Sequence, residues 1–303
     1  MSGVQRSLLR VGVRAPAPCK RRYPRPMLTD FYSIPDLYDI LHTPGTASEA
    51  RGIARVARRF CRSAAATPTY LEPACGSGRL LRHFARRGCR TVGFDIEPAM
   101  VAYAKARARE LPAGQRPTIF EAGMEDFDAA RPRLRVDVAF NIINTIRHLP
   151  TDAALQRHLG AIARVLKPGG IYIVGIGLAA YGLEPPTEDI WTGARQGIRV
   201  TQVVQYEPAT GPKGNAARAE RVVSHLTVRR GRGRAAKEQP KEEHIDSAYS
   251  LRSYNLAQWR EAIAASPLVE LGTAAGTGEP ATPAEPGYYL FVLGLPSKPA
   301  NGR

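Results

Sequence analysis

The sequence contains only four cysteines in 303 residues, and they fit no metal or disulfide pattern. Cys19, Cys61, Cys75 and Cys89 lack the paired spacing of zinc sites and the density of a small disulfide-stapled domain. This predicts reduced thiols, no bound metal and a cytoplasmic setting. The chain also lacks an apolar run long enough to cross a membrane, so no membrane association is predicted.

Acidic residues are missing from one end of the chain. Residues 1–29 carry seven Arg or Lys and no acid, and residues 229–241 carry six against the single acid Glu238. The formal net charge of +16 is therefore concentrated in two segments, and the rest is only mildly basic. This predicts a weak, salt-sensitive affinity for polyanions. We expect 1–29 to be a disordered basic extension, with a mitochondrial transit peptide as the alternative.

The stretch 69–81 lacks the features of two common nucleotide loops. It reads as a buried strand, a turn containing Gly76 and Gly78, and the start of a helix. A third glycine is missing, which argues against a dinucleotide site, and Arg79 stands where a P-loop needs Lys. Glu72 instead precedes the turn, where it can accept hydrogen bonds from a cationic or hydroxylated ligand. An ordinary strand-to-helix turn is the alternative interpretation.

Short apolar strands alternate with amphipathic helices through the first half of the chain. This pattern predicts an α/β fold with a doubly wound parallel sheet, whose ligands bind where the strands end. The first predicted strand ends at Glu72, and the others span 90–95, 117–120, 136–140 and 171–176. The predicted helices span 48–62, 79–87, 98–111 and 151–166.

Polar or polarisable side chains follow four of these strands. Asp95 lies 23 residues after Glu72, where an acid can bind both hydroxyls of a ribose; capping the helix that starts at Glu97 is the alternative. Ile96 and Met124 are predicted to lie on the two faces of an adenine. Glu125 or Asp126 would approach its exocyclic amine, and Asn141 ends the fourth strand.

The chain changes character after the fifth strand. Alternating segments within 197–252 predict an antiparallel insert of about three strands with a basic loop at 229–241. A helix at 255–264 and two strands at 268–273 and 288–295 follow, and 296–303 is a tail. At the other end, the aromatic segment within 30–62 predicts a lid over a cofactor, with a cap on the sheet edge as the alternative.

Residues 30–295 resemble class I S-adenosylmethionine (SAM) dependent methyltransferases of the small-molecule type. The resemblance lies in E-P-A-C-G-S-G at 72–78, V-G-F-D at 92–95, A-G-M-E-D-F at 122–127 and L-K-P-G-G at 166–170. It implies a seven-stranded Rossmann-like sheet whose last strand is antiparallel, and SAM as cofactor. The implied cofactor contacts are Tyr38, Glu72, Ala74, Cys75, Gly76, Gly78, Asp95, Ile96, Met124, Glu125 and Asn141.

A closer resemblance is to bacterial sugar-amine N-methyltransferases, carried by N-T-I-R-H-L at 144–149 and by the insert after the fifth strand. It implies that His148 lies near the methyl acceptor and that Tyr32 or Tyr38 belongs to the lid. One departure is Gly123, where the family often has Asp. Further candidates for the acceptor pocket are Tyr32, Asn144, Tyr181 and Trp191, whereas His158 and His225 are predicted to be structural.

The predicted function is methyl transfer from SAM to a nitrogen or oxygen of a small molecule. His148 is the candidate base, since a neutral histidine can take a proton from an amine near pH 7; a packing role is the alternative. An RNA or protein methyltransferase that uses the basic segments, and a non-catalytic SAM-binding protein, are the other two hypotheses.

Overall fold

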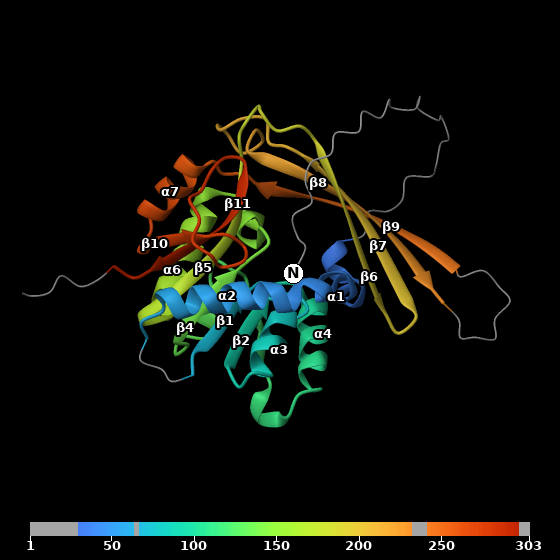
Figure 1. Ribbon diagram of the computed structural model, residues 1–303, viewed down its shortest axis with the longest axis horizontal. Coiled ribbons are helices and arrows are strands. Elements are labelled where there is room, and N and C mark those ends of the chain that lie inside the picture. The colour runs from blue at the N-terminus through green and yellow to red at the C-terminus, as the bar shows by residue number, and fades with distance from the viewer. Residues whose placement is uncertain (1–29, 64–66, 232–240, 297–303) are drawn as a thin grey trace, which may run out of the picture.

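The computed structural model describes residues 30–63, 67–231 and 241–296, which form two sheets (Figure 1). Sheet A has seven strands in the order β10-β11-β5-β4-β1-β2-β3. The five strands β1 to β5 run parallel, and β11 pairs antiparallel with both β5 and β10. Their bounds are β1 Thr69–Pro73, β2 Arg90–Asp95, β3 Thr118–Glu121, β4 Val136–Asn141, β5 Leu166–Leu178, β10 Val269–Ala274 and β11 Gly287–Gly294.

This topology confirms the predicted seven-stranded, doubly wound fold with its antiparallel last strand. The helices fall close to the predicted ranges because their caps are local: Thr151 caps α6, and Asn255 forms a capping box with Gln258 at the start of α7. The helices are α1 Pro35–His42, α2 Thr46–Phe60, α3 Arg79–Ala85, α4 Pro98–Ala108, α5 Phe127–Ala130, α6 Asp152–Val165 and α7 Leu256–Ala264.

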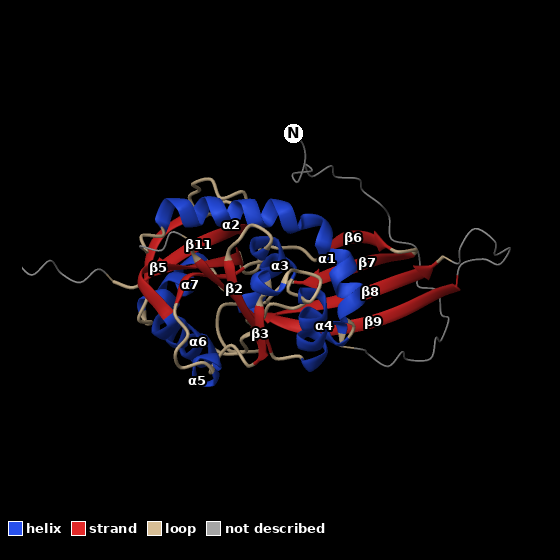
Figure 2. Ribbon diagram, turned by 90° about the horizontal axis from the view of Figure 1, so that it is seen from below, coloured by secondary structure: helices blue, strands red, loops and turns tan. Residues whose placement is uncertain are grey.

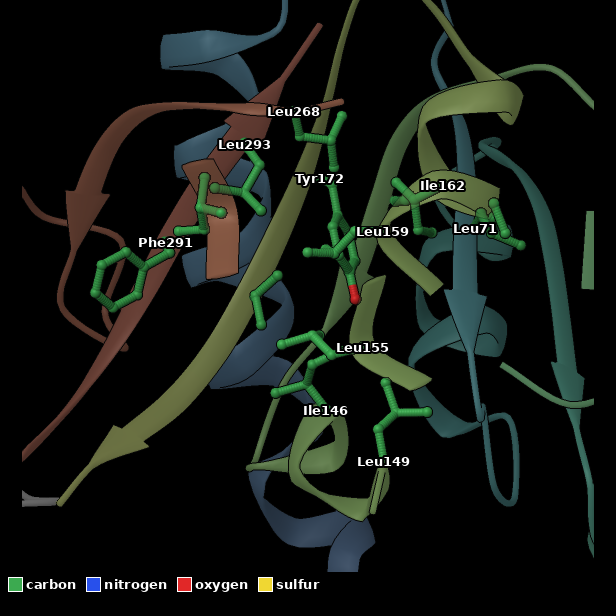
Figure 3. Packing of buried hydrophobic residues seen from close by; sticks show 14 of the residues in the cluster. Leu71, Ile146, Leu149, Leu155, Leu159, Ile162, Tyr172, Leu268, Phe291 and Leu293 are labelled. Atoms are coloured by element: carbon green, nitrogen blue, oxygen red, sulfur yellow. The ribbon is translucent and has the colours of Figure 1, made fainter. Parts of the chain in front are cut away.

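Apolar side chains cover sheet A on both faces. On one face, α2 and α3 pack Ile53, Leu80 and Phe84 against β1, β4, β5 and β11. On the other, α6 and α7 pack leucines and Trp259 around Tyr172 (Figure 3). Figure 2 shows α2 along one side of the sheet and α5 and α6 along the other. A sheet buried on both faces leaves its strand ends as the place for ligands.

Sheet B is the insert after β5, and it differs from the prediction at its edges. It has four antiparallel strands rather than about three: β6 Thr187–Arg195, β7 Ile198–Glu207, β8 Ala219–Arg230 and β9 Lys241–Arg252. The insert therefore begins before residue 197. The strand β6 escaped prediction because most of its side chains are exposed, so its sequence shows no apolar alternation.

The basic loop predicted at 229–241 is also shorter than expected. Arg229 pairs across the sheet with Glu242, and Arg230 pairs with Lys241, so both ends of the segment belong to strands. The core of that loop, the extension 1–29 and most of the tail lie outside the described residues. Within the described ranges, no helix is long and apolar enough to cross a membrane.

The buried carboxylate of Asp39 joins α1 to the helices α3 and α4 and to sheet B. The Asp39 side chain is fully buried and accepts hydrogen bonds from Arg82 Nη2 on α3 at 3.1 Å, Tyr103 on α4 at 3.0 Å and Arg195 Nη1 on β6 at 2.5 Å. Burial acts to raise the pKa of Asp39, but these partners outweigh it and hold the pKa below its usual value. The carboxylate therefore stays charged and links α1 to sheet B.

Replacing Asp39 by Asn should lower the free energy of unfolding by roughly 3 kcal/mol, because three guanidinium groups lose their buried counter-charge. Urea denaturation at pH 7 measures this. Asp36→Asn makes the same charge change at the half-buried start of α1 and should cost less than about 1 kcal/mol. Equal losses in the two variants would contradict a central role for Asp39.

Candidate active site

The loop after β1 is shaped by three residues in the left-handed region. Ala74, Gly76 and Gly78 have φ of 48°, 52° and 69°. A Cβ added to Gly76 would approach Tyr38 Cε1 at 3.2 Å, so glycine lets the lid tyrosine lie directly against the loop. The loop then leads into α3 at Arg79, as predicted.

Asp95 at the end of β2 holds this loop in place. Its carboxylate accepts hydrogen bonds from the backbone N–H of Gly76 at 2.7 Å and of Glu97 at 3.0 Å. The helix cap, the alternative considered for Asp95, is supplied by Glu97 itself, whose side chain accepts from Ala99 N. Asp95 also lines the adjoining cavity, so its remaining lone pairs can accept from ligand hydroxyls.

A cavity of about 300 Å³ opens where β1, β2 and β4 end, beneath the lid. Most of the predicted cofactor and acceptor residues line it. They are Tyr32, Tyr38, Glu72, Ala74, Cys75, Gly76, Asp95, Ile96, Met124, Asn141, Asn144, His148 and Trp191.

Glu72 is the least satisfied group in this cavity. Its side chain is buried, and Oε2 has no hydrogen-bond partner in the described protein. Burial raises the pKa of Glu72 to about 8. A buried acceptor without a partner is costly, so the site is completed by a donor, and a cationic ligand group would also return Glu72 to its charged form.

Two predicted adenine contacts lie on the cavity wall, and one does not. Ile96 is 72% exposed, unusual for a large apolar residue, and Met124 lines the same cavity. Glu125, predicted to approach the adenine amine, is not among the residues that line the cavity. Its Oε2 instead accepts from Arg157 Nε on α6 at 2.6 Å. Gly78 shapes the loop without lining the cavity.

Asn141 is held by a buried chain of hydrogen bonds. Its Nδ2 donates to Pro73 O at 2.7 Å and its Oδ1 accepts from the Tyr172 hydroxyl at 2.5 Å. His158 lies 2.8 Å from that hydroxyl and 2.8 Å from Met124 O, which agrees with the structural role predicted for it. Tyr172 stands among the leucines of α6, with its oxygen inside the cluster (Figure 3). These linked hydrogen bonds hold the ends of β1 and β4 in place where they line the cavity.

His148 meets the lid on the other side of the cavity. It ends the short 3-10 helix Thr145–His148, and its Nε2 lies 3.0 Å from the Tyr32 hydroxyl. Tyr249 of β9 stacks near both rings, at centroid distances of 5.4 and 5.8 Å. Burial lowers the pKa of His148 to about 4 and raises that of Tyr32, so both are neutral at pH 7.

A second cavity, of about 650 Å³, adjoins the first and shares five wall residues with it. Asn144 and Trp191 line both, as expected of acceptor residues. Tyr181 was also predicted to line the acceptor pocket, and this is wrong: its hydroxyl donates to Ser253 O and Gln258 Oε1, away from both cavities. A buried hydroxyl needs a partner, and the start of α7 supplies one.

The wall between the two cavities has an unusual backbone. Ile143 and Asn144 both have positive φ, of 55° and 61°. A β-branched residue rarely adopts this conformation, so the surrounding bonds must impose it. Ile143 N donates to the Tyr288 hydroxyl at 2.9 Å, and Asn144 Oδ1 accepts from Gly177 N at 2.6 Å.

Comparisons with known proteins agree with this geometry. Residues 71–170 match a family model described as a methyltransferase domain. The chain is 26% identical over 196 residues to the dTDP-3-amino-3,4,6-trideoxy-alpha-D-glucopyranose N,N-dimethyltransferase of Streptomyces venezuelae, covering 64% of this chain and 75% of that protein. It is 25% identical over 273 residues to the dTDP-3-amino-3,6-dideoxy-alpha-D-glucopyranose N,N-dimethyltransferase of Streptomyces fradiae, covering 89% and 93%. The chain is a class I SAM-dependent methyltransferase.

The crystal structure of Streptomyces venezuelae DesVI has the same fold as this methyltransferase. The TM-score is 0.65 at 21% identity, over 89% of this chain and all of that one. The cofactor is SAM, as the match to the methyltransferase family indicates. The cavity where the strands of sheet A end fits it, with the unpartnered Glu72 oxygen and the exposed Ile96. Within the described ranges, no group of three His, Cys, Asp or Glu side chains is placed to hold a metal ion.

Sequence reasoning missed several residues of the site. Tyr249 and Gln202 come from sheet B and line the cofactor cavity, and Glu220 lines the second cavity. Their strands alternate like any half-buried strand, so no local signal marked them. Only the docking of sheet B over the strand ends brings them to the site.

We expect SAM binding at pH 7 to release about one proton, because its positive charge converts the neutral Glu72 carboxyl to carboxylate. Calorimetry in phosphate and in Tris would show different apparent enthalpies. Glu72→Gln should remove most of this difference and weaken SAM binding roughly tenfold. Glu121→Gln, exposed at the end of β3, should keep both wild-type values. A wild-type enthalpy independent of buffer would contradict the assignment.

Proposed function

We propose that this methyltransferase methylates an amine nitrogen of a small amino-sugar-like acceptor. The observation that carries the proposal is the Tyr32–His148 pair, which faces the cofactor cavity beside the second cavity. Both long-range relatives are named N,N-dimethyltransferases of amino sugars. Relatives named as ubiquinone biosynthesis O-methyltransferases match only about a third of the chain. Nitrogen is therefore favoured over oxygen.

Bound SAM supplies a methyl group on a sulfonium, a good leaving group, so the protein's main task is to orient the acceptor. The N–C bond forms as the C–S bond breaks, and the electron pair goes to sulfur. A nitrogen must be unprotonated to attack. The Tyr32 oxygen can take the amine proton while the Tyr32 hydroxyl proton moves to His148 Nε2, which is neutral and 3.0 Å away.

The lid and sheet B keep this reaction away from water. Tyr38 lies over Gly76, and its ring packs against Tyr32 and Phe31. Asp39, next to it on α1, holds β6 through Arg195. The proton path and the cofactor loop are therefore positioned by one helix.

The rival hypotheses gain less support. An RNA or protein methyltransferase would need a basic groove beside His148, whereas acids outnumber cations among the described charged residues of the two cavity walls. The basic segments largely lie outside the described residues, so a weak affinity for polyanions stays a prediction, as does a cytoplasmic setting.

His148→Phe should lower kcat by roughly 100-fold while leaving the SAM dissociation constant within about twofold, because the ring is kept and only the proton acceptor is lost. Stopped-flow or radiolabel assays with amino-sugar acceptors measure kcat. His225→Phe, a histidine paired with Asp246 on sheet B, should behave as wild type.

The pH profile separates a proton role from a packing role. The pKa of His148 is about 4, so the ring stays neutral from pH 5 to 8 and its protonation is not the source of an acidic limb there. The acidic limb of the pH profile of kcat/KM should follow the pKa of the acceptor ammonium group. His148→Phe should lower the plateau without moving that limb. An unchanged plateau would leave His148 with a packing role only.

A further inference from the structure

We propose that the acceptor binds as an ammonium and carries no phosphate, unlike the nucleoside-diphosphate sugars named for the relatives. The inference rests on the proposed amine acceptor and specifies its class. It comes from the charge of the 650 Å³ cavity, here called the acceptor chamber, which lies between the 142–144 segment, sheet B and the loop before β11.

The acceptor chamber opens directly onto the cofactor cavity. Ile142, Ile143, Asn144, Trp191 and Tyr206 belong to the walls of both. A molecule in the chamber can therefore reach the Tyr32–His148 pair past the strained 143–144 segment. The cofactor cavity ends on Glu72, a buried carboxyl whose Oε2 has no partner in the described chain.

Among the charged side chains that the structure describes on the walls of both cavities, acids outnumber cations. The charged residues lining the acceptor chamber are Glu49, Glu184, Asp189, Glu220 and the single cation Arg147. Those lining the cofactor cavity are Asp30, Glu72, Asp95, Glu97 and the single cation Arg79. Eight acidic residues thus accompany two arginines on the described walls, and Glu72 among them is neutral until a cation binds. The rest of the chain outside the two basic segments is mildly basic, so the excess of acids is local to the site.

Neither arginine is available for a phosphate. Arg79 Nη2 donates to Glu49 at 2.5 Å and Arg147 Nη2 lies 3.1 Å from Glu220, with a second bond to Ser253. Both side chains are buried in these contacts. The two histidines of the walls do not substitute for them, since burial lowers the pKa of His42 to about 3 and of His148 to about 4.

Phosphate sites in proteins are built from arginines, lysines and exposed backbone N–H groups. A diphosphate placed in the acceptor chamber would meet carboxylates without a free cation among the described wall residues. An ammonium would meet the opposite sign of charge and be attracted. The walls therefore favour an acceptor that carries an ammonium group and disfavour one that carries a diphosphate.

Asp189 is the carboxylate most directly available to the ammonium. It lies on β6, two residues before Trp191, so both side chains project from the same face of the strand into the chamber. The other acids are engaged: Glu49 and Glu220 by the arginines, and Glu184 by Ala180 N at 3.0 Å. Asp189 is exposed, and among the described residues its side chain makes no hydrogen bond or ion pair.

The test compares two probes with the full-length protein and SAM. One is dTDP-3-amino-3,6-dideoxy-glucose, and the other is the methyl glycoside of the same amino sugar, which keeps the ammonium and removes the diphosphate. We expect kcat/KM to be at least about tenfold higher for the methyl glycoside. Asp189→Asn should raise its KM several-fold with little change in kcat, and Asp189→Lys should shift the preference toward the diphosphate.

Glu188→Gln is the matched control, because Glu188 adjoins Asp189 but projects from the opposite face of β6. It should leave both KM values unchanged. A higher kcat/KM for the diphosphate probe would overturn the inference while leaving amine methylation intact.

Failure to methylate either probe would count against the proposed function. The inference is then judged by titrating the S-adenosylhomocysteine complex of the Trp259→Phe variant with each probe, so that the fluorescence followed is that of Trp191. Tighter binding of the diphosphate would overturn it, and tighter binding of the methyl glycoside would support it.

Discussion

Asp39 is a charged group with no exposed surface, and the arrangement of the active site depends on the bonds it accepts. Arg82 reaches it from α3 and also donates to Ser77 O in the glycine-containing loop. Arg195 reaches it from the insert sheet. A carboxylate without these partners could not stay charged in the interior. The helix α1, the loop after β1 and sheet B are therefore positioned by bonds to this one carboxylate.

This arrangement explains how an insert far along the chain becomes part of the active site. Sheet B projects beside α1 (Figure 1), and its apolar face packs Val200, Leu226 and Val228 against Leu37 and Ile40. Gly193 on β6 lies so close that a Cβ would approach the Ile40 carbonyl oxygen at 2.2 Å. With the lid and the insert packed together, the acceptor chamber forms between sheet B and the strand ends of sheet A.

Much of the cofactor cavity could be predicted from the sequence, because the residues that form it follow their strands within a few positions. Glycine spacing near Gly76 and an acid at the end of each of two strands fix backbone and ligand chemistry within a few residues. The acceptor half could not be predicted so well. Tyr249 comes from a strand of ordinary alternation, and Asp189 comes from β6, whose mostly exposed side chains show no apolar alternation. Tyr181 lies away from both cavities because its hydroxyl bonds a residue of α7, a partner that could not be foreseen. Glu125 was misplaced for the same reason, since Arg157 lies on another element.

The central claim is that the two cavities bring an amine nitrogen to the SAM methyl group. The most direct measurement is NMR of the product formed from SAM labelled with carbon-13 in its methyl group, with an amino sugar that also carries free hydroxyls as acceptor. The account predicts that the labelled carbon couples only to protons beside the amine nitrogen. Label attached to a hydroxyl oxygen of the same sugar would contradict it.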